Sequence, residues 1–254
     1  MKIRILGASG GIGAAARTTS ILVDQDILLD AGTGVGDLTL DELRAIDHVF
    51  LTHSHLDHVA MLPFLLDTVG ASRHSPVRVY AQEATLTTLQ RHLFNGELWP
   101  DFSRIPSPEA PFMTYQTLPA GAAITLNHRT LRSIPVNHVV PAVGYLVTGA
   151  GGSLAFSGDT TVTDEFWRTL NAIGDLRHVI IETSFLDADE NLSRISKHLC
   201  PAMLAGEIKK LKPGPQVHIT HLMPGYEDDI MREIARHIPQ STPQRLMRGK
   251  VFEL

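Results

Sequence analysis

The sequence predicts an α/β protein in which two β-sheets pack face to face and helices cover the outside. Short apolar runs with the length of buried strands alternate with helical segments in both halves of the 254-residue chain. Residues 112–156 form a series of short β segments, and helices return after them. No linker, short-period repeat or low-complexity tract divides the chain. We therefore expect one domain, residues 1–254, built as a four-layer sandwich.

Each half of the chain supplies strands and helices of its own. Outside the β-rich region, the expected strands are 2–6, 20–23, 27–29, 49–51, 77–80, 179–181 and 217–219. The expected helices are 40–45, 59–69, 84–94, 165–173, 201–211 and 228–238. Pro63 suits only the start of its helix, because proline has no backbone N–H. Residues 95–111 are rich in proline and polar side chains, so we expect them to be irregular.

The composition is that of an ordinary globular protein and argues against several classes of partner. Hydrophobic residues make up 43% of the chain and charged residues 19%. A net charge of −5, with lysine and arginine scattered, favours neither a nucleic-acid partner nor an anionic membrane. No apolar stretch approaches the ~20 residues that cross a bilayer, and the N-terminal run is too short for a secretory leader. The single Cys200 cannot form an internal disulfide, so we expect a cytoplasmic protein, with a homodimer left open.

Four residues of ligand type fall within residues 53–58, directly after the apolar run 49–51. They are His53, His55, Asp57 and His58. Imidazole and carboxylate are the ligands that suit zinc and its neighbours. His53 and His55 point to the same side of an extended segment, whereas the other two lie where the chain turns into the next helix. One catalytic metal needs only three protein ligands, so this cluster indicates two metals that share a bridging water.

Further candidates follow in the second half, each at the end of an apolar run where loops carry function. His138 ends the run 134–137, Asp159 lies just past the strand 154–156, and His221 follows 217–220. His198 is expected to open a helix. When these residues are considered together with the first cluster, they are favoured as metal ligands, His198 least of all. We expect two divalent ions, zinc first, with manganese or iron as alternatives.

These residues carry a resemblance to a known family. The motif His53-Ser54-His55-Leu56-Asp57-His58 resembles the metal motif of the metallo-β-lactamase superfamily, whose fold is an αββα sandwich. Asp30-Ala31-Gly32 is similar to its first motif, with Asp30 supporting the ligand loop. The resemblance implies that His53, His55 and His138 bind one metal, that Asp57, His58 and His221 bind the other, and that Asp159 bridges both.

A second resemblance narrows the family. His92-Leu93-Phe94-Asn95 and Trp99-Pro100-Asp101-Phe102 are similar to a stretch of class II cyclic-nucleotide phosphodiesterases, and Ile181-Glu182-Thr183-Ser184-Phe185 resembles the segment after their bridging acid. Ala60 departs from the glycine usual in these families. We expect Phe94, Asn95 and Trp99 to contact the substrate. Residues 94–112 contain the longest irregular, proline-rich stretch of the chain, so we expect this segment to form a flap over the metal cleft. Packing of these aromatic residues in the core is the alternative.

The expected reaction is hydrolysis of a 3′,5′-cyclic nucleotide, such as cyclic AMP, to the 5′-monophosphate by a metal-bridged hydroxide. The substrate is then a small phosphodiester. Asp57 holds metal, and His198 is the candidate acid for the leaving alkoxide or a phosphate-orienting group.

Other hydrolases of the fold remain alternatives: a nuclease resembling tRNase Z, whose long arm and basic surface are missing here, or a thioester or lactam hydrolase. A di-iron oxidoreductase is disfavoured, because the resemblance to that class implies glutamate at the second position of the motif, where this chain has His55. A non-catalytic metal module is disfavoured by the complete ligand set.

The glycine-rich loop at residues 7–13 also fits the phosphate-binding pattern of short-chain dehydrogenases. That family needs a tyrosine followed four residues later by lysine, and none of the four tyrosines has one. We therefore predict that this loop is a turn lining the metal cleft.

Overall fold

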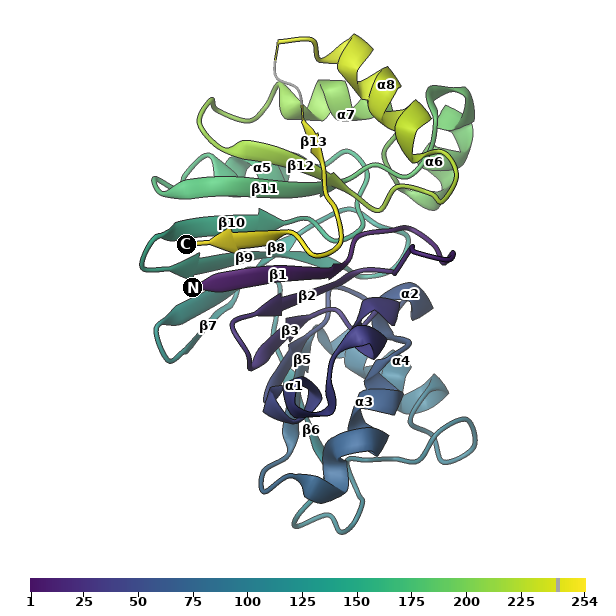
Figure 1. The fold of residues 1–254 in the computed structure, drawn as a ribbon, viewed down its shortest axis with the longest axis vertical. Helices are drawn as coiled ribbons and strands as arrows, with labels where there is room; N and C mark the ends of the chain where they lie inside the picture. The colour runs from purple at the N-terminus through teal and green to yellow at the C-terminus, as the bar shows by residue number, and fades with distance from the viewer. Residues whose placement is uncertain (241–242) are drawn as a thin grey trace.

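The computed structural model describes residues 1–240 and 243–254. Within these ranges the strands form two seven-stranded sheets, and helices cover the outer face of each sheet (Figure 1). The four-layer sandwich predicted from the sequence is confirmed.

The first sheet comes almost entirely from the N-terminal half. In spatial order it contains β14 (Val251–Glu253), β1 (Lys2–Gly7), β2 (Ser20–Val23), β3 (Ile27–Leu29), β4 (His48–Phe50), β5 (Val77–Ala81) and β6 (Met113–Thr117). Pairing is antiparallel from β14 to β3 and parallel from β3 to β6.

The second sheet repeats this plan. In spatial order it contains β7 (Ala123–Leu126), β8 (Arg129–Pro135), β9 (Val143–Gly149), β10 (Gly152–Phe156), β11 (Leu176–Glu182), β12 (Gln216–Thr220) and β13 (Gln244–Arg245). Pairing is antiparallel from β7 to β10 and parallel from β10 to β13. The carboxyl ends of parallel strands share one edge of a sheet, which is where open α/β sheets place their sites.

The helices divide between the two sheets. On the first sheet lie α1 (Leu40–Ala45), α2 (Leu56–Val59), α3 (Leu62–Val69) and α4 (Glu83–His92). On the second lie α5 (Asp164–Leu170), α6 (Glu190–Ser196), α7 (Pro201–Ile208) and α8 (Glu227–His237). Short 3₁₀ turns are η1 (Thr33–Asp37), η2 (Gly70–Ser72) and η3 (Asp187–Asp189). No helix in the described part of the chain is both long and apolar enough to span a membrane.

Three apolar layers hold the sandwich together. Between the sheets, Phe50 stacks on Tyr80 with ring centroids 4.4 Å apart and meets Tyr145 edge-on. A second layer joins the first sheet to α3 and α4, and a third joins the second sheet to α5, α7 and α8. Burial of apolar surface at about 25 cal/mol per Å² makes these layers the main source of stability. They also fix the two parallel strand edges relative to each other.

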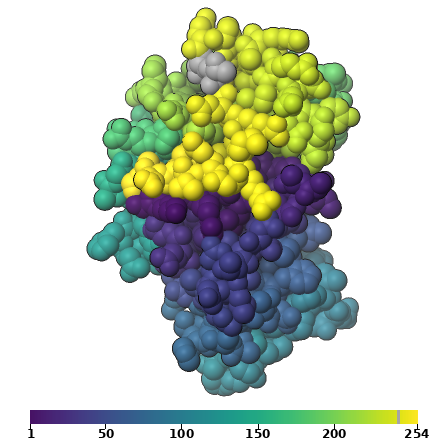
Figure 2. Space-filling model, in the orientation of Figure 1, coloured from purple at the N-terminus to yellow at the C-terminus, as the bar shows by residue number. Residues whose placement is uncertain are grey.

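The two ends of the chain lie side by side, because β14 pairs antiparallel with β1. Figure 2 shows the C-terminal residues against the N-terminal strand across the middle of the visible face. The last strand thereby covers an edge of the first sheet that would otherwise expose unpaired backbone groups.

Two expected helices differ from the structure. The helix expected at 59–69 is split into α2 and α3, because Pro63 lies in the first turn of α3 and requires a new helix start there. Ala60 caps α2. The expectation that His198 opens a helix is wrong: it lies between α6 and α7, directly after Lys197, the C-cap residue of α6, which has a left-handed conformation (φ 55°).

The helix α6 itself was not expected. Ser193 is its only buried residue, so it presents no apolar face with helical spacing to the core. By contrast, the prediction that residues 95–111 are irregular is confirmed, since neither helix nor strand occurs between α4 and β6.

Candidate dinuclear metal centre

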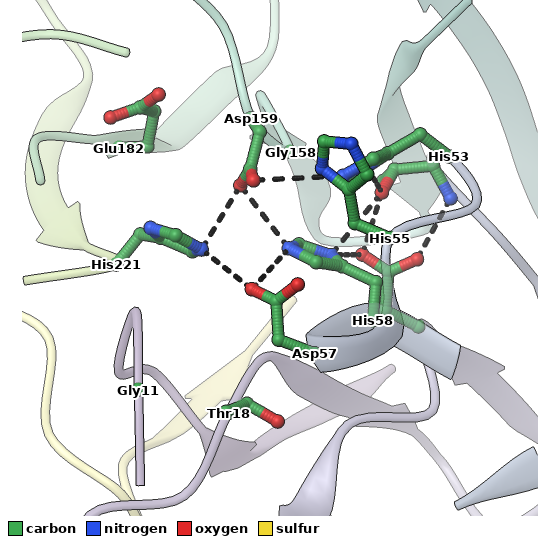
Figure 3. A network of polar contacts seen from close by, with 12 residues as sticks. Gly11, Thr18, His53, His55, Asp57, His58, Gly158, Asp159, Glu182 and His221 are labelled. Atoms are coloured by element: carbon green, nitrogen blue, oxygen red, sulfur yellow. Dashed lines mark hydrogen bonds and ion pairs between the residues drawn. The ribbon is translucent and has the colours of Figure 1, made fainter. Parts of the chain in front are cut away.

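Ligand-type side chains from both sheets converge at the carboxyl ends of the parallel strands (Figure 3). Two groups are each able to hold an ion, and within each group the ligand atoms all lie within 4.8 Å of one another. One consists of His53, His55, His138 and Asp159. The other consists of Asp57, His58, Asp159 and His221. The structure therefore brings together all seven residues expected from the sequence, and Asp159 belongs to both groups.

Asp159 lies between the two groups, and its two carboxylate oxygens face different histidines. Its Oδ1 is 3.2 Å from Nε2 of His58 and 3.4 Å from Nε2 of His221. Its Oδ2 is 3.6 Å from Nε2 of His53 and 3.9 Å from Nε2 of His138. The carboxylate can thus serve one ion with each oxygen.

Four of the histidines engage Nδ1 elsewhere and leave Nε2 for the centre. Nδ1 of His58 donates to Asp30, that of His53 to the Thr52 hydroxyl, and that of His138 to the Lys197 carbonyl. His221 donates from Nδ1 to Ser184, 2.9 Å away. Hydrogen bonds of this kind set the tautomer and ring orientation of metal-binding histidines.

The buried atoms facing the centre fit a cation. Nε2 of His53, Nε2 of His58 and Oδ1 of Asp159 are buried and have no hydrogen-bond partner among the described residues. Nδ1 of His55 lies 3.1 Å from Nε2 of His138, and two lone pairs this close repel each other unless a proton or cation lies between them. Buried polar atoms without partners are costly, and metal ions would satisfy them. The residues present fit two divalent ions.

Electrostatics support the same conclusion. Burial lowers the pKa of His53, His55 and His138, so these imidazoles are neutral at physiological pH, as metal ligands must be. Burial alone would raise the pKa of Asp159, but the surrounding histidines hold it well below its usual value. Burial would lower the pKa of His58, yet Asp159 and Asp30 hold it well above the usual value. A proton therefore competes with an ion for His58.

Asp30 supports the ligand loop as expected. It directly follows β3, is fully buried, and has a left-handed backbone (φ 55°) that few residues other than glycine, asparagine and aspartate adopt. It accepts hydrogen bonds from the backbone N–H and hydroxyl of Thr52, both 2.8 Å, and from His58 at 2.7 Å. Burial raises the pKa of Asp30 despite the His58 partner.

A second buried carboxylate, Glu182, was not among the residues singled out as functional. It ends β11 and accepts from Nδ1 of His198 at 2.7 Å and from the Ser184 hydroxyl at 3.1 Å. It also accepts from the backbone N–H groups of Thr160 and Leu199. The signal that could have found Glu182 is the one that found Asp159: an acid at the end of an apolar strand.

His198 lies beside both metal groups. Its ring centroid is 5.0 Å from that of His138 and 5.2 Å from that of His221. Burial would lower its pKa, but the Glu182 carboxylate raises it to about 9. The Glu182 carboxylate therefore favours the imidazolium form of His198 and engages its Nδ1.

Two positions beside the metal centre require glycine, because neighbouring residues approach their backbone too closely for a Cβ atom. A Cβ atom on Gly10 would lie 2.7 Å from the His221 carbonyl oxygen and 2.8 Å from its ring. A Cβ atom on Gly32 would lie 2.5 Å from the Asp57 carbonyl oxygen. The glycine-rich loop thus packs against His221, as predicted for a turn lining the cleft.

The structure packs the aromatic residues of the expected flap against the protein core. Phe94 is 2% exposed and packs in the apolar layer beneath the first sheet, so the prediction that it contacts substrate is wrong. Trp99 packs against the same layer and against Phe64, with ring centroids 5.1 Å apart. Asn95 uses its side-chain oxygen to accept from the backbone N–H groups of residues 97 and 98. The alternative, aromatic core packing, explains this segment.

The four-layer sandwich carries, at its strand edge, two His/Asp groups that fit a dinuclear metal centre. A family model described as "Beta-lactamase superfamily domain" matches residues 25–242, and the chain belongs to this superfamily. It is a metal-dependent hydrolase of the metallo-β-lactamase fold.

Two relatives differ in the activity that their names state. The chain is 27% identical to the "Ribonuclease Z" of Bradyrhizobium diazoefficiens, with 94% of this chain and 95% of that protein covered. It is also 27% identical to the "Probable 3′,5′-cyclic-nucleotide phosphodiesterase" of Yersinia pestis, over 78% of this chain. The match spans 63% of that relative, less than two thirds of its length.

Solved structures show the same fold. Unliganded yeast PDE1 superposes with a TM-score of 0.81 at 18% identity, covering 100% of this chain and 99% of that one. The short form of human tRNase Z superposes with a TM-score of 0.69 at 17% identity, with the same coverage. At these identities the likeness establishes the fold alone.

Proposed function

We propose that this chain hydrolyses 3′,5′-cyclic nucleotides, such as cyclic AMP, to 5′-monophosphates. The observation that carries the proposal is the position of His198, whose ring lies beside both metal groups and whose Nδ1 lies 2.7 Å from the Glu182 carboxylate. Opening a cyclic phosphodiester releases a sugar alkoxide, which is strongly basic and needs a proton. A thioester releases a thiol with a pKa near 8.5, which leaves without an acid.

The residues divide the work as follows. His53, His55, His138, Asp57, His58, His221 and the shared Asp159 would hold two ions. Such ions supply a low-pKa water and neutralise charge on phosphoryl oxygens. His198 would give the proton on Nε2 to the leaving oxygen. Glu182 keeps that proton in place by its bond to Nδ1.

Processing of RNA is the second candidate, supported by the Ribonuclease Z relative that matches along nearly its whole length. Proteins that bind RNA or DNA backbones neutralise phosphates with lysine and arginine, and the net charge of this chain is −5. We therefore place the small cyclic substrate first.

One substrate panel separates these activities. Metal-reconstituted enzyme would be assayed against cyclic AMP, cyclic GMP, a bis-aryl phosphodiester, a precursor tRNA, a thioester and a β-lactam. We expect turnover of the cyclic nucleotides and the aryl diester. Turnover of precursor tRNA alone would replace the proposal with the nuclease, and turnover of the thioester or lactam alone would overturn both.

The two-metal arrangement has its own measurement. We expect metal analysis of the purified, reconstituted protein to approach two ions per chain, with zinc expected first because of the histidine-rich ligand set. A stoichiometry of one that added zinc or manganese cannot raise would contradict the dinuclear centre.

A further inference from the structure

Lys197, the C-cap residue of α6, has a backbone conformation that its side chain disfavours. Its φ is 55°, in the left-handed region, and its backbone N–H donates to the carbonyl of Ser193. Glycine is the usual residue at such a helix end, because a Cβ atom makes the left-handed conformation costly. Strained backbone of this kind persists where surrounding contacts hold it, and it is concentrated at functional sites.

The contacts that hold Lys197 include two with a metal ligand, His138. The Lys197 carbonyl accepts from Nδ1 of His138 at 3.1 Å, and the Lys197 ammonium donates to the His138 carbonyl, also at 3.1 Å. One residue thus holds the ligand at its ring and at its backbone. His138 belongs to the first metal group, together with His53, His55 and Asp159.

His138 needs such support, because it lies in an irregular segment. Residues 136–142 connect β8 to β9 and form neither helix nor strand. Val139, directly after the ligand, is 49% exposed. Asn137, directly before it, is bonded to Thr160 and Thr161, so the backbone is fixed on one side of His138 only. The Lys197 ammonium fixes the other side through the carbonyl of His138.

The orientation of the His138 ring decides whether the first metal group is complete. Its Nε2 lies 3.1 Å from Nδ1 of His55 and 3.9 Å from Oδ2 of Asp159, so a ring that turns away removes a ligand from that group. Loss of the groups that orient a metal-binding histidine typically lowers metal affinity by about 10–100-fold. The second metal group does not contain His138, so its ion should be affected much less.

We propose that Lys197 is a positioning residue of the metal centre, which holds His138 at its ring and its carbonyl and thereby sets the affinity of the first metal group. The inference rests on the dinuclear centre that the proposed function requires, not on the choice of substrate. A glycine at this helix end would avoid the backbone strain but would lack the ammonium group. Because Lys197 directly precedes His198, the end of α6 positions a metal ligand and the candidate acid together.

Metal affinity, measured without turnover, tests this role. The metal-free protein would be titrated with zinc in competition with a chromophoric chelator. We expect Lys197→Met, which keeps most of the side-chain length but loses the N–H donors, to lower the affinity for one of the two ions by roughly 10–100-fold. The affinity for the other ion should be nearly unchanged. Lys197→Arg keeps a donor and should bind both ions nearly as tightly as the wild type.

Two further variants separate the ammonium group from the backbone. Lys209 is the C-cap residue of α7, but it is exposed and has a right-handed backbone (φ −61°), so Lys209→Met should bind both ions like the wild type. Lys197→Gly suits the left-handed backbone and allows the carbonyl bond to Nδ1 to persist, yet it lacks the ammonium group. It should therefore lose affinity as Lys197→Met does, while thermal unfolding of the metal-free protein shows that the fold is retained.

Variants that disable one metal group identify the affected ion. In His221→Ala, which weakens the second group, adding Lys197→Met should lower the affinity for the ion that remains. In His55→Ala, which weakens the first group, adding Lys197→Met should have little effect.

Unchanged affinity in Lys197→Met or in Lys197→Gly would overturn the proposal, as would an equal effect in the two backgrounds. Raised affinity would also overturn it, because the ammonium group would then act mainly by repelling the cations. A wild-type protein that binds only one ion would contradict the dinuclear centre, and the effect of Lys197→Met on that ion would then decide about Lys197 separately.

Discussion

The two sheets support the centre with buried carboxylates that work in different ways. Asp30, after β3, directs all its side-chain hydrogen bonds to Thr52 and His58, which belong to one segment of seven residues. Glu182, at the end of β11, binds groups from separate segments: Thr160, Ser184, and the pair His198 and Leu199. The first sheet thus contributes a local cluster oriented by one acid. The second contributes scattered residues that one acid connects.

This difference predicts different losses when each part is changed. Changes on the first sheet should remove metal. Changes around Glu182 should alter proton transfer while metal stays bound. The following variants test that distinction, from the largest expected effect to the smallest.

Replacing Asp57 should have the largest effect. Its carboxylate lies 3.1 Å from Nε2 of His221 and 3.5 Å from Nε2 of His58, within the second metal group. We expect Asp57→Ala to abolish turnover and leave the fold intact, because the side chain is partly exposed and little packing is lost. Initial rates and circular dichroism measure the two effects. Asp67→Ala, an exposed acid on α3, is the control. Near-normal rates in Asp57→Ala would show that Asp57 holds no ion.

Replacing His198 should remove general-acid help but not metal. We expect His198→Ala to lower the rate by ~10²–10⁴-fold for alkyl leaving groups, and far less for activated aryl esters, which leave without a proton. The measurement is kcat on a cyclic nucleotide and on an aryl diester, with metal content determined in parallel. Equal losses on both substrates would instead assign His198 to phosphate binding or to the shape of the site.

Replacing Asp30 should weaken metal binding through His58. In Asp30→Asn an amide NH₂ group takes the place of one carboxylate oxygen. In one orientation it replaces Oδ2, which accepts from both His58 and the Thr52 hydroxyl, and in the other it replaces Oδ1, which accepts from the Thr52 backbone N–H. We expect a loss of roughly 10–100-fold in metal affinity, the usual effect of removing such a support. Competition with a chelator measures the affinity. Glu182→Gln in the same assay should bind metal like the wild type, and a matching loss there would remove the distinction between the two sheets.

The smallest expected effect is a shift of a pH profile. Glu182 raises the pKa of His198 to about 9 against the effect of burial. The protonated form is the acid, so activity on cyclic nucleotides should persist below about pH 9 and fall as pH rises through that value. In Glu182→Gln burial would dominate, and the alkaline limb should move to lower pH. The profile for an aryl diester serves as control, and a limb that stays in place would mean that Glu182 does not govern this proton.

The sequence by itself determined the layered fold and the clustered half of the centre. Apolar runs of strand length and helical spacing are local signals, so the alternation of elements and the seven ligand-type residues could be identified. His53, His55, Asp57 and His58 lie within six residues, and their proximity follows from chain connectivity alone. Asp159 and His221 stood out because each follows an apolar strand.

Only the tertiary structure decided which distant side chains meet. Glu182 contacts Thr160 and His198, which are 22 and 16 residues away, and no local pattern specifies such a contact. Phe94 and Trp99 looked like substrate contacts in sequence, yet burial against α3 and α4 depends on the surrounding helices, because an aromatic ring gains stability wherever apolar surface is available. The helix α6 was missed for the converse reason. Its apolar residues Leu192 and Ile195 are exposed, so no apolar face with helical spacing marks this helix in the sequence, and only the folded chain shows it.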